Sequence, residues 1–377
     1  MAMKISTSVY KGRKAWVLDN DAIALTLTVG GGHIAALELK ERPGINPLWV
    51  PPWKSLEPWD YVPAKHAGSY QLKLLASILG HNICLGWFGD PSESEAAAGL
   101  EVHGEAPVAK WRLAAKQVTE KGVAMTCQCD LPVSQMQLSR TISSARGSCV
   151  IHVKEVVAST SRRDLPFTLC EHVTVGPPFL EKGVTMFDMP ATQAHTFPGP
   201  FSNRMRLRPD TQFVWPVGPG ARGRRVDLRQ IAKSQPASSD FTTQLIDPER
   251  AGAWVSAVNP KLGLLLAYVW KREDFPWVGN WEENSGRTGT PWKGQALTRG
   301  LEFSNTPFPV GLRKAVDQGR FQGQPTYRWL PALGRIEVEF DILLVAISGT
   351  TTGVSEIRRS RHGYNIAVTG SPGLGVR

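Results

Sequence analysis

The chain has 377 residues, of which 42% are hydrophobic and 20% are charged. This composition excludes a disordered chain and a fibrous repeat, and the length is sufficient for one large β domain or two ordinary domains. The formal net charge of +10 raises the possibility of nucleic-acid or anionic ligands, but the basic residues are scattered except at residues 222–225 and 358–361. Because no basic and aromatic module stands out, nucleic acid is not an expected partner.

Short runs in which apolar and polar residues alternate recur along the chain and predict half-buried β-strands. Strands are expected, in chain order, at residues 14–18, 23–29, 33–39, 110–116, 123–129, 136–142, 150–157, 167–175, 254–258, 264–270, 336–340 and 343–348. The 36 glycines and 28 prolines supply turns between many of them. This pattern predicts an all-β protein, a large antiparallel sandwich with one or two short helices.

One helix is expected at residues 70–79, where leucine and alanine recur at helical spacing before Gly80. Two long loops are expected, at about residues 46–66 and 190–239, because both segments are rich in proline. Long loops in a compact domain often line a functional cleft. No internal repeat and no linker divides the chain, so we expect a single domain over residues 1–377.

The five cysteines are odd in number, form no Cys-x-x-Cys pair and mostly have apolar neighbours, which predicts buried thiols rather than disulfides or a zinc site. The N-terminal segment lacks an apolar signal region, and no window offers about 18 apolar residues for a membrane span. We therefore expect a cytoplasmic protein with no membrane partner, as a monomer or a homodimer.

Three polar residues lie in β-patterned segments in the order His103, His172 and Glu302. Two imidazoles and a carboxylate are the groups needed to move protons on a sugar hydroxyl and a ring oxygen near neutral pH. Each also has a structural alternative. His103 could be a hydrogen-bonded residue at a strand end. His172 could be a core or surface histidine whose hydrogen bonds are satisfied, and Glu302 could point from a strand into solvent.

The order of these motifs resembles the aldose 1-epimerase (galactose mutarotase-like) superfamily. The segment Leu-Glu-Val-His-Gly at residues 100–104, followed by Trp111, is similar to its His-Gly segment, and residues 165–172 resemble the strand that leads to its second histidine. Residues 300–307, Gly-Leu-Glu-Phe-Ser-Asn-Thr-Pro, resemble its late Leu-Glu motif. The resemblance extends over roughly residues 22–348.

The chain also departs from the family pattern at two of these motifs. Val-Thr-Val-Gly-Pro-Pro follows His172 where Pro-Tyr-Phe is usual, and Phe303-Ser304 replaces Thr-Gln after the glutamate. The chain therefore resembles a divergent branch of the superfamily.

The resemblance implies a β-supersandwich with a sugar-binding cleft and an isomerase that interconverts sugar anomers. By similarity, Glu302 is the general base at the anomeric hydroxyl, and His172 is the general acid toward the ring oxygen, on the opposite side. His103 is a hydrogen-bonding partner of the open-chain oxygen. This mechanism implies no metal and no organic cofactor.

Further sugar contacts are expected from the segment just before the Leu-Glu motif, which combines tryptophans with amide and acidic side chains. Aromatic faces suit the C–H faces of a pyranose ring, and planar polar groups suit its hydroxyls. The contacts expected from this segment are Trp281, Glu282, Trp277 and Asn280. His81 is added because it follows the expected helix in a glycine-rich turn region, and Arg299 as a contact for an anionic group on the substrate. The tryptophans could instead anchor a loop, and Arg299 could pair with a carboxylate.

Two other functions remain open from the residues alone. A carbohydrate-binding or sensor protein on the same fold would bind sugar without turning it over. Glu101, His103 and Glu105 alternate and could supply three metal ligands, which leaves room for a metal-assisted sugar lyase or hydrolase, although Gly104 can interrupt such a strand.

Overall fold

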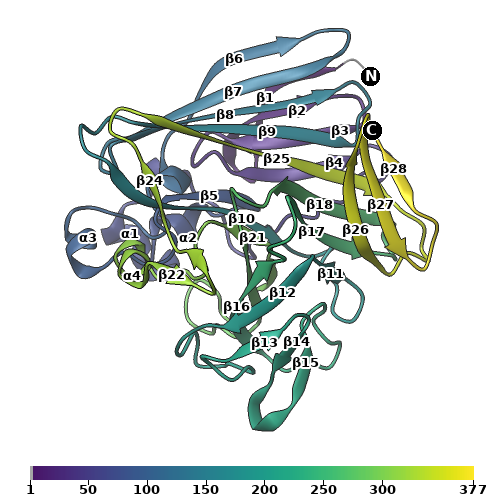
Figure 1. Ribbon diagram of the computed structural model, residues 1–377. Coiled ribbons are helices and arrows are strands. Elements are labelled where there is room, and N and C mark those ends of the chain that lie inside the picture. Colours follow the sequence, from purple (N-terminus) through teal and green to yellow (C-terminus); the bar gives the residue numbers. More distant parts are fainter. Residues whose placement is uncertain (1–2) are drawn as a thin grey trace.

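The computed structural model describes residues 3–377 and contains two large antiparallel sheets that pack face to face (Figure 1). The larger sheet runs in the order β1 (Lys4–Tyr10), β2 (Arg13–Asp19), β3 (Ile23–Thr28), β4 (Ile34–Leu39), β5 (His81–Gly86), β10 (Leu165–Val175), β20 (Leu297–Gly300), β19 (Trp277–Asn284), β16 (Ser238–Ile246), β12 (Ala191–Thr196) and β13 (Gln212–Val214). Strand β21 (Glu302–Ser304) pairs with β10 and β19, and β24 (Arg328–Leu330) pairs with β10. This thirteen-stranded sheet carries the candidate site described below.

The second sheet has eight strands in the order β11 (Met186–Asp188), β17 (Gly252–Asn259), β18 (Leu264–Lys271), β25 (Arg335–Ala346), β9 (Val150–Ser159), β8 (Met136–Ala145), β7 (Gly122–Leu131) and β6 (Arg112–Val118). Its alternating strands turn one face toward the core, as β7 does with Val123, Met125, Cys127 and Cys129. All five cysteines are free thiols, and four of them are buried.

A third sheet of three strands, β26 (Gly353–Ser360), β27 (Gly363–Thr369) and β28 (Leu374–Val376), packs on the outer face of the eight-stranded sheet (Figure 1). Ile357 and Tyr364 form a second apolar cluster there with Leu265 and Leu343. Because β18 and the second half of β25 are covered on both faces, residues 264–270 and 342–346 are continuous apolar runs, whereas the first half of β25 alternates.

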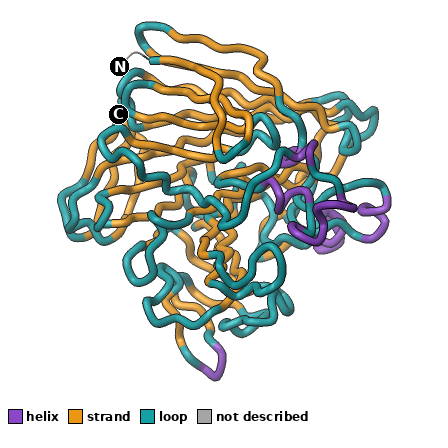
Figure 2. Tube along the Cα trace, turned by 180° about the vertical axis from the view of Figure 1, so that it is seen from behind, coloured by secondary structure: helices purple, strands orange, loops and turns teal. Residues whose placement is uncertain are grey.

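The remaining elements are short. They comprise the hairpins β14 (Val217–Pro219) with β15 (Arg225–Asp227) and β22 (Arg320–Phe321) with β23 (Gln324–Pro325), the α-helices α1 (Pro63–Tyr70), α2 (Lys73–Ser77), α3 (Glu93–Ala97) and α4 (Leu312–Gln318), and the 3₁₀ turns η1 (Pro58–Asp60), η2 (Ala106–Val108) and η3 (Ala221–Gly223). Figure 2 shows these helices, apart from η3, gathered at one side of the sandwich. No helix within residues 3–377 is long and apolar enough to span a membrane.

The all-β prediction is confirmed, whereas the segments expected to be irregular or helical differ in detail. The helix expected at residues 70–79 is shorter, because Gln71 has a left-handed φ of 65° and separates α1 from α2. Residues 190–239, expected as a loop, contain β12 to β15, and residues 46–66 contain η1 and the start of α1. The strands within residues 190–239 are short and lie in sequence rich in glycine, proline and arginine. Polar and apolar residues alternate too little there for strands to be predicted.

A polar network is buried between the two large sheets, directly behind strand β10. Arg140 Nε donates to Glu155 Oε1 at 2.6 Å, and Arg140 Nη2 lies 3.5 Å from Glu171 Oε2. The same Glu171 oxygen lies 2.7 Å from His81 Nε2. Burial and the neighbouring Glu171 carboxylate raise the pKa of Glu155 to about 8, although the Arg140 guanidinium opposes this shift.

Candidate functional site

A cavity of about 240 Å³ opens on the face of the thirteen-stranded sheet that points away from the eight-stranded sheet. Strands β10 and β21 supply its floor through His172 and Glu302, and α2 supplies part of its wall through Leu74 and Leu75. The volume lies below the 300 to 1,000 Å³ or so that is usual for drug-sized ligands. The cavity therefore suits a molecule of monosaccharide size.

The two strands of the floor bring His172 and Glu302 together. Their register pairs Cys170 with Ser304, so the residues two positions along are also neighbours on the same face. His172 Nε2 lies 3.4 Å from Glu302 Oε1, and the two residues are only 5% and 1% exposed. An imidazole and a carboxyl thus lie side by side at the bottom of the cavity.

Burial sets the protonation of this pair. It raises the pKa of Glu302 well above its ordinary value, although the Arg287 guanidinium partly opposes this shift. Burial lowers the pKa of His172 to about 4. Within the described chain, neither Glu302 oxygen has a hydrogen-bond partner, and His172 Nδ1 has none either. Burial therefore favours the neutral form of both groups, with the acidic proton on Glu302 and a free lone pair on His172.

His103 lies in the same cavity, held by two hydrogen bonds to one residue. Its backbone N–H donates to the Gly89 carbonyl at 3.0 Å, and its Nδ1 accepts from the Gly89 N–H at 2.9 Å. The ring centroid lies 5.2 Å from that of His172. Burial lowers the pKa of His103 well below its ordinary value, so the ring is neutral and carries its proton on Nε2. This proton is available to a ligand.

Of the six expected sugar contacts, only Trp281 lines the cavity. The other five were assigned by their place in the chain, and the structure does not bring them into the site. Strand alternation is the main reason, since Asn280 and Glu282 project from the face of β19 opposite to that of Trp281. Trp277 shares the face of Trp281 but is fully buried beside Phe321, with 5.7 Å between ring centroids.

Glu282 and Arg299 belong instead to a buried ion-pair cluster on the opposite face. Arg299 Nη1 lies 3.4 Å from Glu282 Oε2, and Arg206 Nη2 donates to the same oxygen at 2.9 Å. His81 points into the sandwich core, where it contacts Glu171 as described above, because its neighbour Asn82 is the residue that faces outward opposite His172. Arg299 is therefore paired with a carboxylate, which was the alternative to its contacting a sugar.

Arg287 and Trp292 line the cavity but were not expected from the sequence. Both lie in the loop between β19 and β20, where no periodicity or motif marks them. The Arg287 guanidinium lies over the rings of Trp292 at 4.9 Å, Trp281 at 5.3 Å and Phe201 at 5.5 Å. Asp90 also lines the cavity, at its exposed edge.

The suggested metal ligands do not converge. Lys73 Nζ donates to Glu101 at 2.7 Å, and the Ser134 N–H donates to Glu105 at 2.6 Å, while His103 alone faces the cavity. The positive φ of 65° at His103 interrupts the extended backbone that would align the three side chains. In residues 3–377 no group of three His, Cys, Asp or Glu side chains is placed to hold a metal ion.

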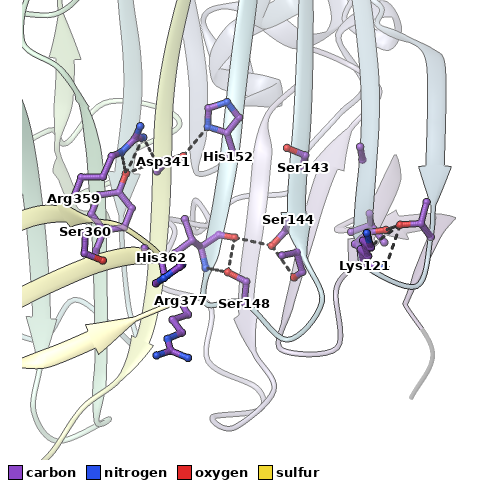
Figure 3. A pocket seen from close by; sticks show the side chains of 18 of the residues that line it. Lys121, Ser143, Ser144, Ser148, His152, Asp341, Arg359, Ser360, His362 and Arg377 are labelled. Atoms are coloured by element: carbon purple, nitrogen blue, oxygen red, sulfur yellow. Dashed lines mark hydrogen bonds and ion pairs between the residues drawn. The ribbon is translucent and has the colours of Figure 1, made fainter.

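A larger and more open hollow of about 600 Å³ lies between strands β7 to β9 and the C-terminal sheet (Figure 3). The buried acidic residue of its lining, Asp341, is already engaged by neighbouring side chains. Asp341 accepts hydrogen bonds from His152 Nδ1 at 2.7 Å, from Arg359 Nη2 at 2.7 Å and from the Tyr364 hydroxyl. These bonds join the C-terminal sheet to the eight-stranded sheet, so we place the candidate active site in the smaller cavity.

Comparison with known proteins bears on the fold. No family model matches the sequence, and no curated protein matches it. Solved structures do match: a "putative aldose 1-epimerase" of Klebsiella pneumoniae has a TM-score of 0.63 at 15% identity and covers 91% of this chain and 84% of its own.

Two further solved structures are galactose mutarotase-like proteins. That of Clostridium acetobutylicum has a TM-score of 0.60 at 11% identity, covering 92% of this chain and 99% of its own. That of Lactobacillus casei has a TM-score of 0.53 at 12% identity, covering 88% and 100%. The chain therefore has the galactose mutarotase-like fold.

Proposed function

We propose that this protein is a carbohydrate-active isomerase that interconverts the anomers of a sugar, as an aldose 1-epimerase does. The observation that carries the proposal is the 3.4 Å separation of His172 Nε2 and Glu302 Oε1 at the floor of a monosaccharide-sized cavity. In a pyranose the anomeric hydroxyl oxygen and the ring oxygen are bonded to the same carbon. An acid and a base that lie side by side can therefore reach both oxygens.

This arrangement changes the expected geometry of the reaction. The sequence suggested an acid and a base on opposite sides of the ring, whereas the two groups approach from one side. It also favours the reverse assignment of roles, because burial leaves the proton on Glu302 and the lone pair on His172.

In the proposed reaction Glu302 gives its proton to the ring oxygen while His172 takes the proton of the anomeric hydroxyl. The bond between C1 and the ring oxygen breaks, and C1 becomes the aldehyde carbon of the open-chain sugar. Rotation about C1–C2 presents the other face of the aldehyde, and ring closure by the reverse proton transfers gives the other anomer. Each proton transfer of this kind contributes roughly 10²- to 10⁴-fold in rate.

The other residues of the cavity bind the sugar. His103 Nε2–H donates a hydrogen bond to an oxygen at the reacting carbon, where negative charge develops. The Trp281 ring offers an apolar face to the C–H groups of the pyranose.

Anomer equilibration followed by NMR across a panel of aldoses tests the proposal. Pure α or β anomer is added to the protein, and the first-order rate is compared with that in buffer. We expect acceleration that Glu302→Gln and His172→Gln each reduce by at least about 100-fold, while Glu337→Gln, an exposed glutamate on β25, leaves the rate unchanged.

The result that would overturn the proposal is a wild-type protein that binds a sugar without accelerating its equilibration. If Glu302→Gln then binds that sugar as well as the wild type does, the protein is a carbohydrate-binding or sensor protein. Sensitivity of turnover to a chelator would favour a metal-assisted lyase or hydrolase instead.

A further inference from the structure

Arg287 is the cavity residue whose surroundings the proposed reaction leaves unexplained. Its guanidinium is caged by Trp281, Trp292 and Phe201, and its side chain remains 33% exposed. Aromatic faces attract a cation without supplying it with strong hydrogen-bond acceptors, so the N–H groups of Arg287 are not taken up by these rings. The residue can therefore receive a ligand at its edge.

The described part of the protein offers this guanidinium few hydrogen-bond acceptors or ion-pair partners. Within residues 3–377 its one ion pair is with Glu283, at 3.5 Å between Nε and Oε2, and none of its N–H groups makes a hydrogen bond to protein. Glu283 Oε1 is occupied by the backbone N–H groups of Gly286 and Arg287. Burial lowers the pKa of Arg287, which reflects this incomplete compensation. A partly buried charge without hydrogen bonds is costly until an acceptor arrives.

Arg287 is also placed apart from the reacting groups. It lines the same cavity as His172 and Glu302, yet it lies beyond ion-pair distance of Glu302. A sugar whose anomeric carbon rests on His172 and Glu302 would thus direct another of its substituents to Arg287. Asp90, the other charged residue at the cavity, is exposed to solvent, so its repulsion of an anion is screened.

We propose that Arg287 is a specificity-determining residue that binds an anionic substituent of the sugar, either a carboxylate or a phosphate. The planar fork of a guanidinium matches both groups through paired N–H···O bonds. This inference rests on the proposed function for the identity of the reaction, and it adds the substrate class: sugar acids or sugar phosphates rather than neutral aldoses.

The test compares three sugars that share one ring, namely glucose, glucuronate and glucose 6-phosphate, together with the galactose series. Anomer equilibration by NMR gives kcat/KM for each. We expect at least one anionic member to exceed its neutral counterpart by about 10- to 100-fold, since hydrogen bonds to charged groups contribute at this level. Preference for the uronate or for the phosphate identifies which anion the cavity accepts.

Two variants of Arg287 connect this preference to the guanidinium. Arg287→Gln should bring the ratio of anionic to neutral kcat/KM close to one, and Arg287→Lys should restore part of it, because a lysine keeps the charge but lacks the fork. Arg112→Gln is the matched control, since Arg112 is an exposed residue of β6 with the same change in charge, and it should retain the wild-type ratio.

Binding is measured separately in Glu302→Gln, by calorimetry and by the fluorescence of the tryptophans around Arg287. If anionic sugars bind more tightly than neutral ones and Arg287→Gln removes the difference, the inference holds even where no sugar is turned over and the proposed function fails. If the wild type turns over and binds neutral and anionic sugars equally well, the inference is overturned while the proposed function stands.

Discussion

Gly279 on strand β19 lies directly opposite Glu302 on strand β21, and the absence of a side chain at Gly279 leaves room for the Glu302 carboxyl. A Cβ at position 279 would lie 3.2 Å from Glu302 Oε2 and 2.8 Å from Phe241 Cζ. Gly279→Ala should therefore displace the carboxyl from His172. Small misplacements of a catalytic group cost up to about 100-fold, so we expect a loss of at least about tenfold in the rate of anomer equilibration measured by NMR.

The control for this variant is Gly252→Ala at the start of β17, where a Cβ would meet nothing within 4 Å. It should keep the wild-type rate, and both variants should keep the wild-type circular dichroism spectrum. A Gly279→Ala protein that is folded and fully active would show that the position of the carboxyl does not matter.

Glu302→Gln should stabilise the protein at neutral and alkaline pH. The folded state raises the pKa of Glu302, so the unfolded chain loses this proton first, and wild-type stability falls as pH rises above about 4.5 toward the folded pKa. Glutamine has no proton to lose. The variant should therefore gain up to about 1–3 kcal/mol in free energy of unfolding at pH 8, and the gain should disappear below about pH 4.

Urea denaturation at a series of pH values measures this difference. Glu337→Gln is the control with the opposite sign, because the Lys154 ammonium lowers the pKa of Glu337 in the folded state. Removing Glu337 should leave stability unchanged or lower it slightly at pH 8. A Glu302→Gln protein that is less stable than the wild type at pH 8 would contradict a buried, protonated Glu302.

The pH dependence of kcat/KM should have its acidic limb near pH 4 instead of near the ordinary histidine value of about 6.5. The active form of the His172–Glu302 pair holds one proton. Burial lowers the pKa of His172 to about 4, and below this pH His172 takes up a second proton and can no longer act as the base. The alkaline limb follows the raised pKa of Glu302. A profile measured between pH 3.5 and 10, corrected for the buffer-catalysed rate, distinguishes these positions. An acidic limb near 6.5 would mean that His172 titrates as an exposed residue.

His152 should stabilise the docking of the C-terminal sheet at acidic to neutral pH. Its hydrogen bond to Asp341 raises its pKa, so this contribution is present below about pH 6.5 and is lost as pH rises through the folded pKa. His152→Gln should be less stable than the wild type at pH 6 by under about 1 kcal/mol, since the pair is partly screened by solvent. The difference should narrow at pH 9 and at high salt.

Thermal unfolding of both proteins at pH 6 and pH 9 measures this effect. His362→Gln removes an exposed imidazole that makes no ion pair within the described chain, and it should leave the melting temperature unchanged. If His152→Gln lowers the melting temperature by the same amount at both pH values, the histidine acts by packing alone.

The strands were predictable because alternation is a local property. The runs at residues 123–129, 136–142 and 150–157 lie within β7, β8 and β9, which pair in sequence. The same alternation could have separated Trp281 from Glu282, since neighbours on a strand cannot both face the cavity. Both were included in the prediction because of their position in the chain, although alternation alone would have kept only one of them.

Other features depend on contacts between distant segments and leave no local signal. Arg287 is an ordinary loop residue until the fold brings Phe201 and Trp292 around it. His81 and Asn82 are equally polar in the sequence, and the pairing of β5 with β10 decides which of them lies beside His172. The expected roles of His172 and Glu302 came from the family resemblance, whereas burial, which shifts their pKa values in opposite directions, depends on the fold of this chain.

The C-terminal sheet covers an apolar strip on β17, β18 and β25 that includes Trp254, Leu265 and Leu343. On a sheet face of this kind, uncovered hydrophobic side chains attract other chains. A version of the protein that ended before Gly353 would keep every residue of the candidate site and yet present this strip to solvent. Strands β26 to β28 thus protect the sandwich from self-association, and constraints on their sequence need not reflect the chemistry in the cavity.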